Sequence, residues 1–314
     1  MPVEFCVTLT CQIQKKGTTW NLALHRDGYL ALKKRKRRIR RNLKLALIGA
    51  SSSLLLFLCL LFYSYWVEPN WIDVNYLQLT LPHLAPEFKD YRIVHISDIH
   101  TDKSMTKRRL SRIFKKVNQQ QGDVIAITGD FVTGNQERFI PNLRDTIGQL
   151  TPKDKTVAVL GNHDYWAKPE EIAKALTQNG IVTLRNDVYT LRKGSAVLHI
   201  AGIDDVLAGK SDLDLLLQRL PKEGTAILLA HEPDFASTSA KTSRFDLQLS
   251  GHSHAGQVRI PGFKPPALPP LGEIYYSGLY QVGNMLEYTN RGIGVSGIHL
   301  RFSARPEITV ITLS

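Results

Sequence analysis

The sequence predicts an α/β protein in which two sheets pack face to face with helices outside, preceded by one transmembrane helix. Short, nearly continuous apolar runs occur between residues 92 and 250 and alternate with helix-like stretches, which is typical of buried strands in an α/β fold. Closer to the amino terminus, residues 45–67 contain no charged side chain. A helix of that length measures about 35 Å, which is enough to cross a bilayer. A chain of 314 residues has room for one large domain and such an appendage.

The distribution of charge predicts how the chain is divided. The net charge is +12, but residues 33–44 alone carry nine Lys or Arg and no acid. A block of this kind can bind nucleic acid. Because an uncharged run follows it directly, we expect it instead to stay on the cytoplasmic side of a membrane, with lipids and not nucleic acid as its partner. The expected segments are a cytoplasmic tail (1–44), an uncleaved single-pass anchor (45–67), a lead-in (68–89) and a catalytic domain outside the cytoplasm (90–314).

Further elements follow from the local residue pattern. Three helices are predicted, at residues 105–120, 169–179 and 212–220, the second with Pro in its first turn. Three strands are predicted between residues 181 and 200, and a last strand at 308–313. Five prolines within residues 261–270 predict a loop.

Polar motifs follow five of the apolar runs at the point where each run ends. In chain order they are Asp98-Ile99-His100, Gly129-Asp130, Gly161-Asn162-His163-Asp164, His231 and Gly251-His252-Ser253-His254. Because residues i and i+2 of a strand share a face, both ends of the first motif can reach one ion. Active sites of open α/β sheets lie at such strand ends. The glycines allow the backbone to turn sharply there and to approach bound ions closely.

The side chains of these motifs are suited to binding metal ions. They offer Asp and Asn oxygens and imidazole nitrogens without a thiolate, which favours Mn, Fe, Zn, Ni or Mg over an iron–sulfur cluster or a structural zinc site. The three cysteines, Cys6, Cys11 and Cys59, lie in the tail and the apolar segment, so thiol catalysis is excluded for the domain.

Each motif by itself also has an ordinary structural explanation. A lone Asp98 or Asp130 would more often cap a helix or form a turn, and a lone His231 would more often be a packed histidine. Their order and their common position after strands favour a metal site. Five histidines belong to no motif: His25, His83, His95, His199 and His299. Asp204 and Asp205 are expected to form a turn rather than to line the site.

Residues 90–260 resemble the calcineurin-like metallophosphoesterase superfamily, whose pattern is D-x-H, G-D, G-N-H-[DE], H and G-H-x-H. The segments Glu68-Pro69, Leu81-Pro82 and Ala255-Gly256-Gln257 are similar to its membrane-anchored bacterial phosphodiesterase branch, in which Gly usually stands where this chain has Ala255. The resemblance implies a four-layer α/β/β/α sandwich and an enzyme that uses two divalent metal ions.

The resemblance also implies a role for each motif residue. One ion would take Asp98, His100, Asp130 and His254, and the other would take Asp130, Asn162, His231 and His252, so that Asp130 bridges. The expected catalytic residues are His163, which would face the substrate, and Asp164, which would fix the tautomer of His163. Two cations ~3.5–4 Å apart activate a shared water and neutralise charge on the phosphoryl oxygens.

Three functions are compatible with these features. The first is a phosphodiesterase or pyrophosphatase for a lipid-linked or envelope phosphate. The resemblance places UDP-2,3-diacylglucosamine hydrolysis in lipid A synthesis in this class, although that substrate is cytoplasmic. The second is an extracytoplasmic phosphodiesterase of cell-wall or nucleotide phosphates. The third is an inactive metal-binding interaction module, which the intact ligand set disfavours. The loop at 261–270, with Phe263, Leu268 and Leu271, is expected to be a rigid surface loop rather than a lip for acyl chains.

Overall fold

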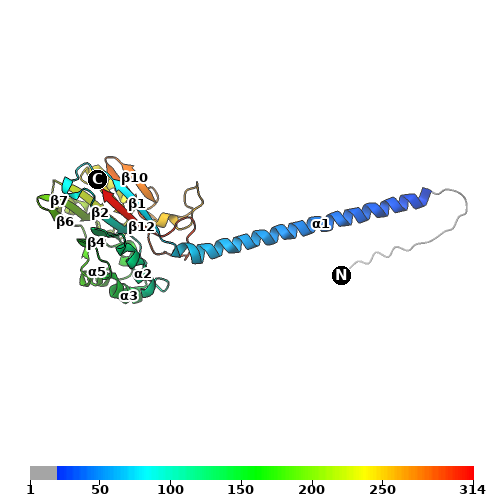
Figure 1. Cartoon of the computed structure of the whole chain (residues 1–314), viewed down its shortest axis with the longest axis horizontal. Coiled ribbons are helices and arrows are strands. Elements are labelled where there is room, and N and C mark those ends of the chain that lie inside the picture. Colours follow the sequence, from blue (N-terminus) through cyan, green and yellow to red (C-terminus); the bar gives the residue numbers. More distant parts are fainter. Residues whose placement is uncertain (1–19) are drawn as a thin grey trace. The chain divides into compact units, whose positions relative to one another are not determined.

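The computed structural model describes residues 20–314, with side chains from residue 28 onward, and these form two units divided after residue 60. The first unit is the greater part of helix α1 (Trp20–Phe62), coloured blue in Figure 1. Within the described residues, it is the one helix that is long and apolar enough to cross a membrane. Residues 45–62 of the anchor predicted at 45–67 therefore lie in a helix that also contains the basic block, and residues 63–67 form a π-helix directly after it.

The amino-terminal end of α1 differs from the prediction. The lack of a clear pattern in residues 1–32 predicts a loose tail, but the helix already begins at Trp20. Leu, Ala, Lys and Arg predominate after this point, no proline interrupts them, and all four are good helix formers. Residues 1–19 lie outside the described part of the chain.

Two six-stranded sheets make up the second unit, residues 61–314. The strand order in the first sheet is β1 (Asp73–Leu79), β12 (Glu307–Leu313), β2 (Arg92–Ile96), β3 (Val124–Thr128), β4 (Lys155–Val159) and β5 (Val182–Thr183). In the second it is β10 (Gly278–Val282), β11 (Met285–Thr289), β9 (Leu247–Ser250), β8 (Thr225–Leu229), β7 (Ala196–Gly202) and β6 (Asp187–Lys193). Most neighbours are parallel; the pairs β12–β2, β10–β11 and β6–β7 are antiparallel.

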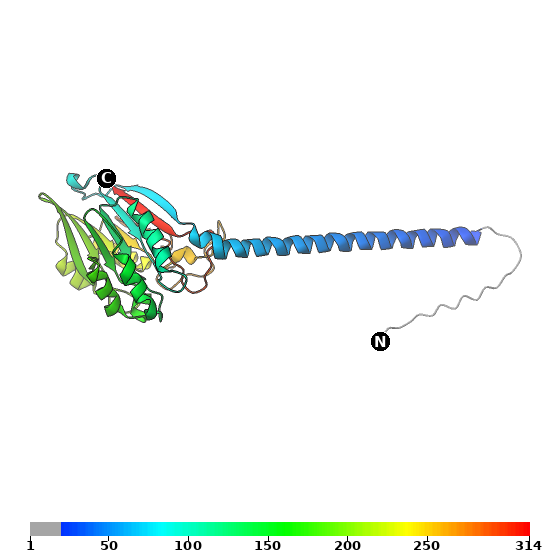
Figure 2. The ribbon, with the colours of Figure 1, turned by 60° about the horizontal axis from the view of Figure 1, so that its bottom comes forward.

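Helices cover the outer face of each sheet (Figure 2). Against the first sheet lie α2 (Lys107–Asn118), α3 (Ile140–Ile147) and α5 (Pro169–Gln178), and against the second lie α6 (Leu213–Arg219) and α7 (Ala236–Ser239). Alternate side chains of strand β8 pack on opposite faces of the second sheet. Its Ile227 and Leu229 belong to the core between the sheets, whereas Ala226 and Leu228 pack with Leu216 of α6. The predicted four-layer α/β/β/α sandwich is thus confirmed.

The predicted helices and strands are present with ends shifted by a few residues, and the prolines of 261–270 lie in a loop without helix or strand. The sequence pattern did not reveal β1, α3, β10 or β11. Strand β1 lies within the expected lead-in and pairs in parallel with β12 along its whole length, so this part of the lead-in belongs to the domain. It was missed because its apolar residues alternate with polar ones, as in an edge strand, instead of forming a continuous run.

Candidate metal centre and active site

The predicted ligands lie just after the ends of β2, β3, β4, β8 and β9, with Asn162 at the start of the helix that follows β4, which brings motifs from distant parts of the chain to one edge of the two sheets. Five of them have a left-handed backbone: Asp98 (φ 51°), His100 (48°), Asp130 (55°), His252 (68°) and His254 (49°). Asp and His tolerate this region better than most residues. Backbone strain of this kind concentrates at functional sites, where the surrounding structure holds it in place.

Two glycines permit the close approach of these turns. Gly129 has a φ of 90°, and a Cβ atom there would lie 2.7 Å from Nδ1 of His231. Gly161 has an ordinary extended backbone, but a Cβ atom at this position would collide with the carboxylate of Asp130. The predicted need for glycine is therefore conformational at the first position and steric at the second.

Two groups of ligand atoms converge around Asp130. Asp98, His100 and His254 form one buried group, and Asp130, His231 and His252 form the other; the ligand atoms within each group lie within 4.8 Å of one another. Oδ1 of Asn162 lies 3.1 Å from Nε2 of His231 and so belongs to the second group. The structure thus brings together all seven residues that the sequence predicts as ligands.

Asp130 lies between the two groups. Its Oδ2 is 3.5 Å from Nε2 of His100 and 3.3 Å from Nε2 of His231. Its other oxygen, Oδ1, accepts a hydrogen bond of 2.9 Å from the backbone N–H of His163. One carboxylate oxygen therefore faces both groups at once, which is the position required of a bridging ligand.

Backbone carbonyls orient two of the imidazole rings. Nδ1 of His231 donates to the carbonyl of Thr128 at 2.7 Å, and Nε2 of His252 donates to the carbonyl of Pro270 at 2.9 Å. The remaining nitrogens of the two rings, Nε2 of His231 and Nδ1 of His252, face each other at 3.1 Å. Metal-binding histidines are commonly held by a second hydrogen bond of this type. Pro270 also gives the proline-rich loop a role in the site, because it fixes His252.

The donor set fits divalent metal ions. Besides the pair just described, Nε2 of His100 and Nε2 of His254 lie 3.0 Å apart. If two nitrogens each lie ~2.1 Å from one ion and the nitrogen–metal–nitrogen angle is a right angle, the nitrogens are separated by ~3.0 Å. All of these side chains are buried, where facing lone pairs without a cation are costly.

The protonation states of Asp98, His100 and His252 favour cation binding as well. Burial by itself raises the pKa of Asp98, but the nearby His254 and His231 rings hold it below its usual value, so the carboxylate stays ionised. Burial lowers the pKa of His100 and of His252, so both rings are neutral. His231 is the exception: burial lowers its pKa, but Asp130 reverses the effect and the net shift is upward.

The predicted contact between Asp164 and His163 is absent among the described residues. Asp164 does not fix the tautomer of His163: its Oδ1 accepts from the backbone N–H groups of Phe131 and Val132, and its Oδ2 accepts from that of Gly161. Instead, Nδ1 of His163 accepts a 2.9 Å hydrogen bond from the N–H of Gly134. The reason is that α4 (Asn162–Trp166) begins at this motif, and Asp164, in its first turn, points back to its N-terminus.

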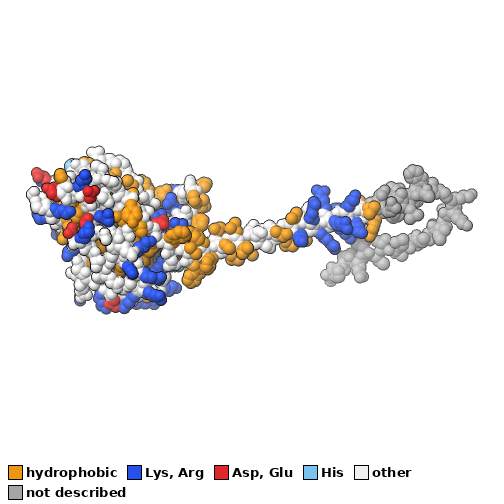
Figure 3. Space-filling view, in the orientation of Figure 1, with side chains coloured by type: hydrophobic (Ala, Val, Ile, Leu, Met, Phe, Trp, Pro, Cys, Tyr) orange, Lys and Arg blue, Asp and Glu red, His pale blue; other side chains and the backbone are white. Residues whose placement is uncertain are grey.

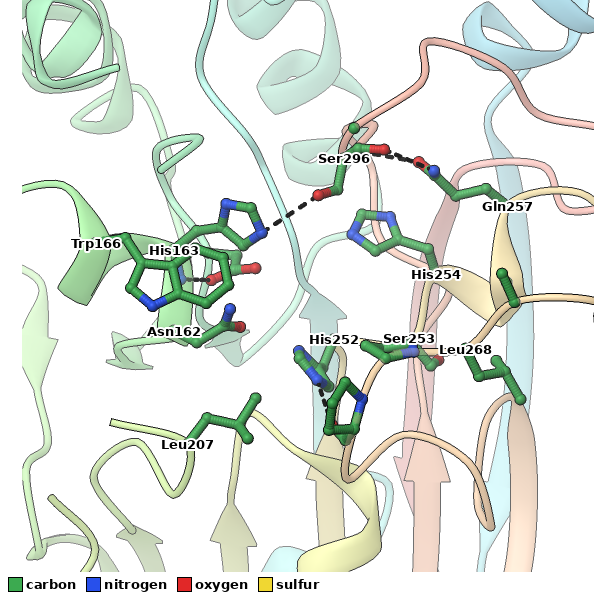
Figure 4. A pocket seen from close by; sticks show the side chains of 16 residues that line it. Asn162, His163, Trp166, Leu207, His252, Ser253, His254, Gln257, Leu268 and Ser296 are labelled. Carbon is green, nitrogen blue, oxygen red and sulfur yellow. Dashed lines mark hydrogen bonds between the residues drawn. The ribbon is translucent and has the colours of Figure 1, made fainter. Parts of the chain in front are cut away.

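His163 faces a pocket of about 520 Å³ that opens onto the metal centre. Its Nε2 lies 3.3 Å from Oγ of Ser296, and the ring of Trp166 packs 4.6 Å from its own (Figure 4). Leu207 and Leu268 lie on opposite sides of the pocket. The sequence did not reveal Trp166, Leu207 or Ser296. For Trp166 a signal was available, since it follows the Gly-Asn-His-Asp motif by two residues on a short helix.

Asp204 and Asp205, which are predicted to form a turn, each accept hydrogen bonds from neighbouring groups. Oδ1 of Asp205 accepts from the N–H of Ala208 at 2.6 Å, as expected for a turn. Asp204 accepts from the hydroxyl of Tyr165 at 2.7 Å and from the guanidinium of Arg185 at 2.9 Å. Both aspartates are therefore engaged in holding the loop after β7.

This fold and this convergence of ligands agree with the comparison to known families. The Calcineurin-like phosphoesterase family matches residues 91–256, and the chain belongs to this family. It is therefore a metal-dependent phosphoester hydrolase that uses two divalent metal ions. The match covers β2 to the end of the last motif and so includes every predicted ligand.

Individual relatives extend the similarity beyond the family region. The chain is 34% identical over 260 residues to the uncharacterized metallophosphoesterase YkuE of Bacillus subtilis, covering 80% of this chain and 88% of the relative. It is 28% identical over 259 residues to phosphodiesterase YaeI of Escherichia coli (80% and 92%). It is 33% identical over 259 residues to a transmembrane protein with metallophosphoesterase domain of Danio rerio, covering 78% of this chain but only 57% of that protein.

Proposed function

We propose that this protein is a membrane-anchored phosphodiesterase that cleaves a phosphodiester or pyrophosphate bond in an amphipathic, lipid-linked or envelope substrate. The observation that supports this proposal most directly is the position of Asp130 between two buried groups of ligand atoms at the floor of the pocket. In this proposal Asp98, His100, Asp130 and His254 hold one ion, and Asp130, Asn162, His231 and His252 hold the other. The ions would supply an activated water and would neutralise charge on the phosphoryl oxygens.

His163 would assist the departure of the leaving oxygen. Because Nδ1 accepts from Gly134, the neutral ring carries its proton on Nε2, the atom that faces the pocket. Nε2–H can then donate a hydrogen bond to an oxygen on which negative charge develops. Asp164 would act as a positioning residue, since it fixes the backbone on both sides of the site without touching His163.

The pocket wall supports an amphipathic substrate. Trp166, Leu207 and Leu268 stand next to the ligand groups, so a phosphate at the ions would have apolar surface beside it. The narrower prediction of UDP-2,3-diacylglucosamine has no support in the relatives' names, and the broader class is proposed here. The predicted topology, with the catalytic domain outside the cytoplasm, favours an envelope substrate. An extracytoplasmic cell-wall or nucleotide phosphodiester is the second candidate.

The test is hydrolysis of bis(p-nitrophenyl) phosphate by the full chain in detergent with added Mn²⁺. We expect turnover that EDTA abolishes and that Mn²⁺ restores. A matched variant, Asp98→Asn, keeps the side-chain shape but removes a ligand charge, so its rate should fall by at least about a hundredfold. Undiminished turnover after chelation, with no metal found by elemental analysis, would refute the proposal.

A further inference from the structure

Three large apolar side chains are mostly exposed on two neighbouring loops of the domain. Ile260 is 59% exposed, Phe263 70% and Ile298 75%. Water-soluble domains carry single exposed apolar residues, but a group of them on one surface marks a binding surface. We call Ile260, Phe263 and Ile298 the apolar rim.

The apolar rim is continuous with the part of the chain where α1 ends. The ring of Tyr63 packs against Phe302 with centroids 6.4 Å apart, and Tyr65 packs against His299 at 5.3 Å. The carbonyl of Phe302 in turn accepts a 2.8 Å hydrogen bond from the N–H of Arg259. Both loops of the rim are thus attached to the last residues of the predicted apolar segment, 45–67. Figure 3 shows apolar side chains gathered on the domain beside this point.

The same two loops form one wall of the catalytic pocket. Gln257 and Ser296, which both line the pocket, join the loops: the amide nitrogen of Gln257 donates to the carbonyl of Ser296 at 2.7 Å, and its amide oxygen accepts from the N–H of Ser296 at 2.8 Å. Ile260 follows Gln257 by three residues and Ile298 follows Ser296 by two. The rim therefore lies close to the pocket as well as to the end of the anchor.

A second hollow beside the Ser296 loop, lined by Val295, Gly297 and His299 of that loop, has the composition expected at a lipid headgroup. It measures about 670 Å³ and shares Gly297 with the catalytic pocket. Tyr65 and Trp66 contribute aromatic rings to it, and Lys103 and Arg112 contribute exposed cations. Aromatic rings beside cations are typical of residues at the membrane–water boundary.

We propose that the apolar rim docks into the surface of the bilayer that α1 enters, so that the catalytic pocket opens at the level of the phospholipid headgroups. A bilayer is the occupant that these observations favour, because the rim is continuous with the end of a membrane-spanning segment and is bordered by cations that suit anionic headgroups. The docking is independent of the catalytic assignment. The docking would also favour a lipid-linked phosphodiester as the substrate, and this second conclusion rests on the proposed function.

The docking is tested with the full chain in phosphatidylcholine–phosphatidylglycerol nanodiscs that hold one chain each. The domain has no cysteine of its own, so replacing Cys6, Cys11 and Cys59 with Ser gives a cysteine-free protein into which single labelling sites can be introduced.

In this cysteine-free protein, the new cysteines of Phe263→Cys and Ile298→Cys are each labelled with nitrobenzoxadiazole. The matched control is Tyr76→Cys on β1, because Tyr76 is 69% exposed, as Phe263 is. Lipids with a doxyl group on the upper acyl chain should quench the labels at 263 and 298 but not at 76. In discs without doxyl lipids, the apolar surroundings should blue-shift the emission of the labels at 263 and 298 relative to that at 76.

Equal behaviour at all three positions would overturn the proposal. A signal at 263 and 298 that is lost in single-chain discs but returns in discs with two chains would also overturn it, because the occupant would then be a second copy. The use of fluorescence separates this result from catalysis, so an inactive but docked enzyme would refute the proposed function alone.

A second measurement addresses the substrate. Two p-nitrophenyl phosphodiesters with the same leaving group are compared, one soluble and one carrying a hexadecyl chain in vesicles. The triple variant Ile260→Ser, Phe263→Ser, Ile298→Ser should hydrolyse the soluble diester at an unchanged rate and the hexadecyl diester about tenfold more slowly. Tyr76→Ser should change neither rate. Equal loss on both substrates in the triple variant would contradict the role of the rim.

Discussion

Arg301 donates a hydrogen bond of 3.1 Å from Nη2 to Nδ1 of His254 and thereby holds the far side of a proposed metal ligand. The guanidinium is fully buried, and it also donates to the carbonyls of Gly294 at 2.7 Å and Ala304 at 2.7 Å. Burial lowers the pKa of Arg301 to about 9, so the group remains a cation at neutral pH. The opposite nitrogen of the ring, Nε2, lies 3.3 Å from Oδ1 of Asp98. Arg301 therefore positions His254 for the first group of ligands.

Replacing Arg301 tests this positioning role. Lys in its place keeps the charge but cannot make the forked set of hydrogen bonds, so we expect Arg301→Lys to fold and to lose ~10–100-fold in activity or metal affinity. Elemental analysis and rates on bis(p-nitrophenyl) phosphate measure both. The control is Arg291→Lys, because Arg291 lies in the same region but pairs with Glu307 at 2.6 Å and does not touch a ligand. Equal metal loss in both variants would indicate a general effect on the loop.

Asp130 faces both ligand groups, and its removal should therefore empty both sites. We expect purified Asp130→Ala to retain no metal, whereas His254→Ala should lose only the ion shared with Asp98 and keep about one per chain. Metal content by mass spectrometry, with circular dichroism to confirm folding, distinguishes the two variants. A count of two ions per chain in folded Asp130→Ala would remove the bridging assignment.

His163 and Asp164 should differ in what their loss affects. For His163→Ala we expect a fall in kcat of ~10²–10⁴-fold with both metals retained, and a smaller fall for a p-nitrophenyl than for an alkyl leaving group, because the better leaving group needs less assistance. For Asp164→Asn we expect loss of stability by roughly 1–3 kcal/mol, since the amide cannot accept from three backbone N–H groups. A measurement of the melting temperature distinguishes a loss of stability in Asp164→Asn from a loss of catalysis in His163→Ala. An unchanged melt with a large fall in kcat for Asp164→Asn would return it to a catalytic role.

The sequence was sufficient to predict which side chains converge at the proposed metal centre, because each follows a strand, and strand ends are visible as apolar runs. It was not sufficient for the contacts of these residues. Asp164 and His163 are neighbours in the motif, but the short helix α4 directs the carboxylate towards the backbone of the β3 turn. Arg301 could not be recognised, because it lies 47 residues from His254 in a segment without regular secondary structure. The edge strand β1 was missed because its apolar residues alternate with polar ones and do not form a continuous run.

His95 should make the domain sensitive to acid. Burial lowers its pKa to about 4, its Nε2 is hydrogen-bonded to Thr128 at 2.9 Å, and its Nδ1 has no partner. Because the folded-state pKa lies below the unfolded value of about 6.5, the stability that this histidine contributes is complete above pH 6.5 and is lost as the pH falls towards 4, by roughly 3 kcal/mol. In EDTA, which removes any effect of metal release, the melting temperature of the wild type should fall by roughly 6–12 °C more than that of His95→Gln between pH 7 and 4. Parallel curves would show that His95 does not titrate in this range.

The basic block before the anchor predicts the orientation of the protein. Residues 33–44 carry nine Lys or Arg, and residues 68–83 carry none, so we expect the amino terminus in the cytoplasm and the catalytic domain across the membrane. Alkaline phosphatase and a fluorescent protein are fused separately after Ser314. We expect phosphatase activity without fluorescence, and we expect replacement of the nine basic residues by Gln to weaken this preference. A fluorescent fusion without phosphatase activity would place the domain in the cytoplasm. That result would favour a nucleotide-linked lipid precursor over an envelope phosphodiester, because the pocket would then open on the side where such precursors are made.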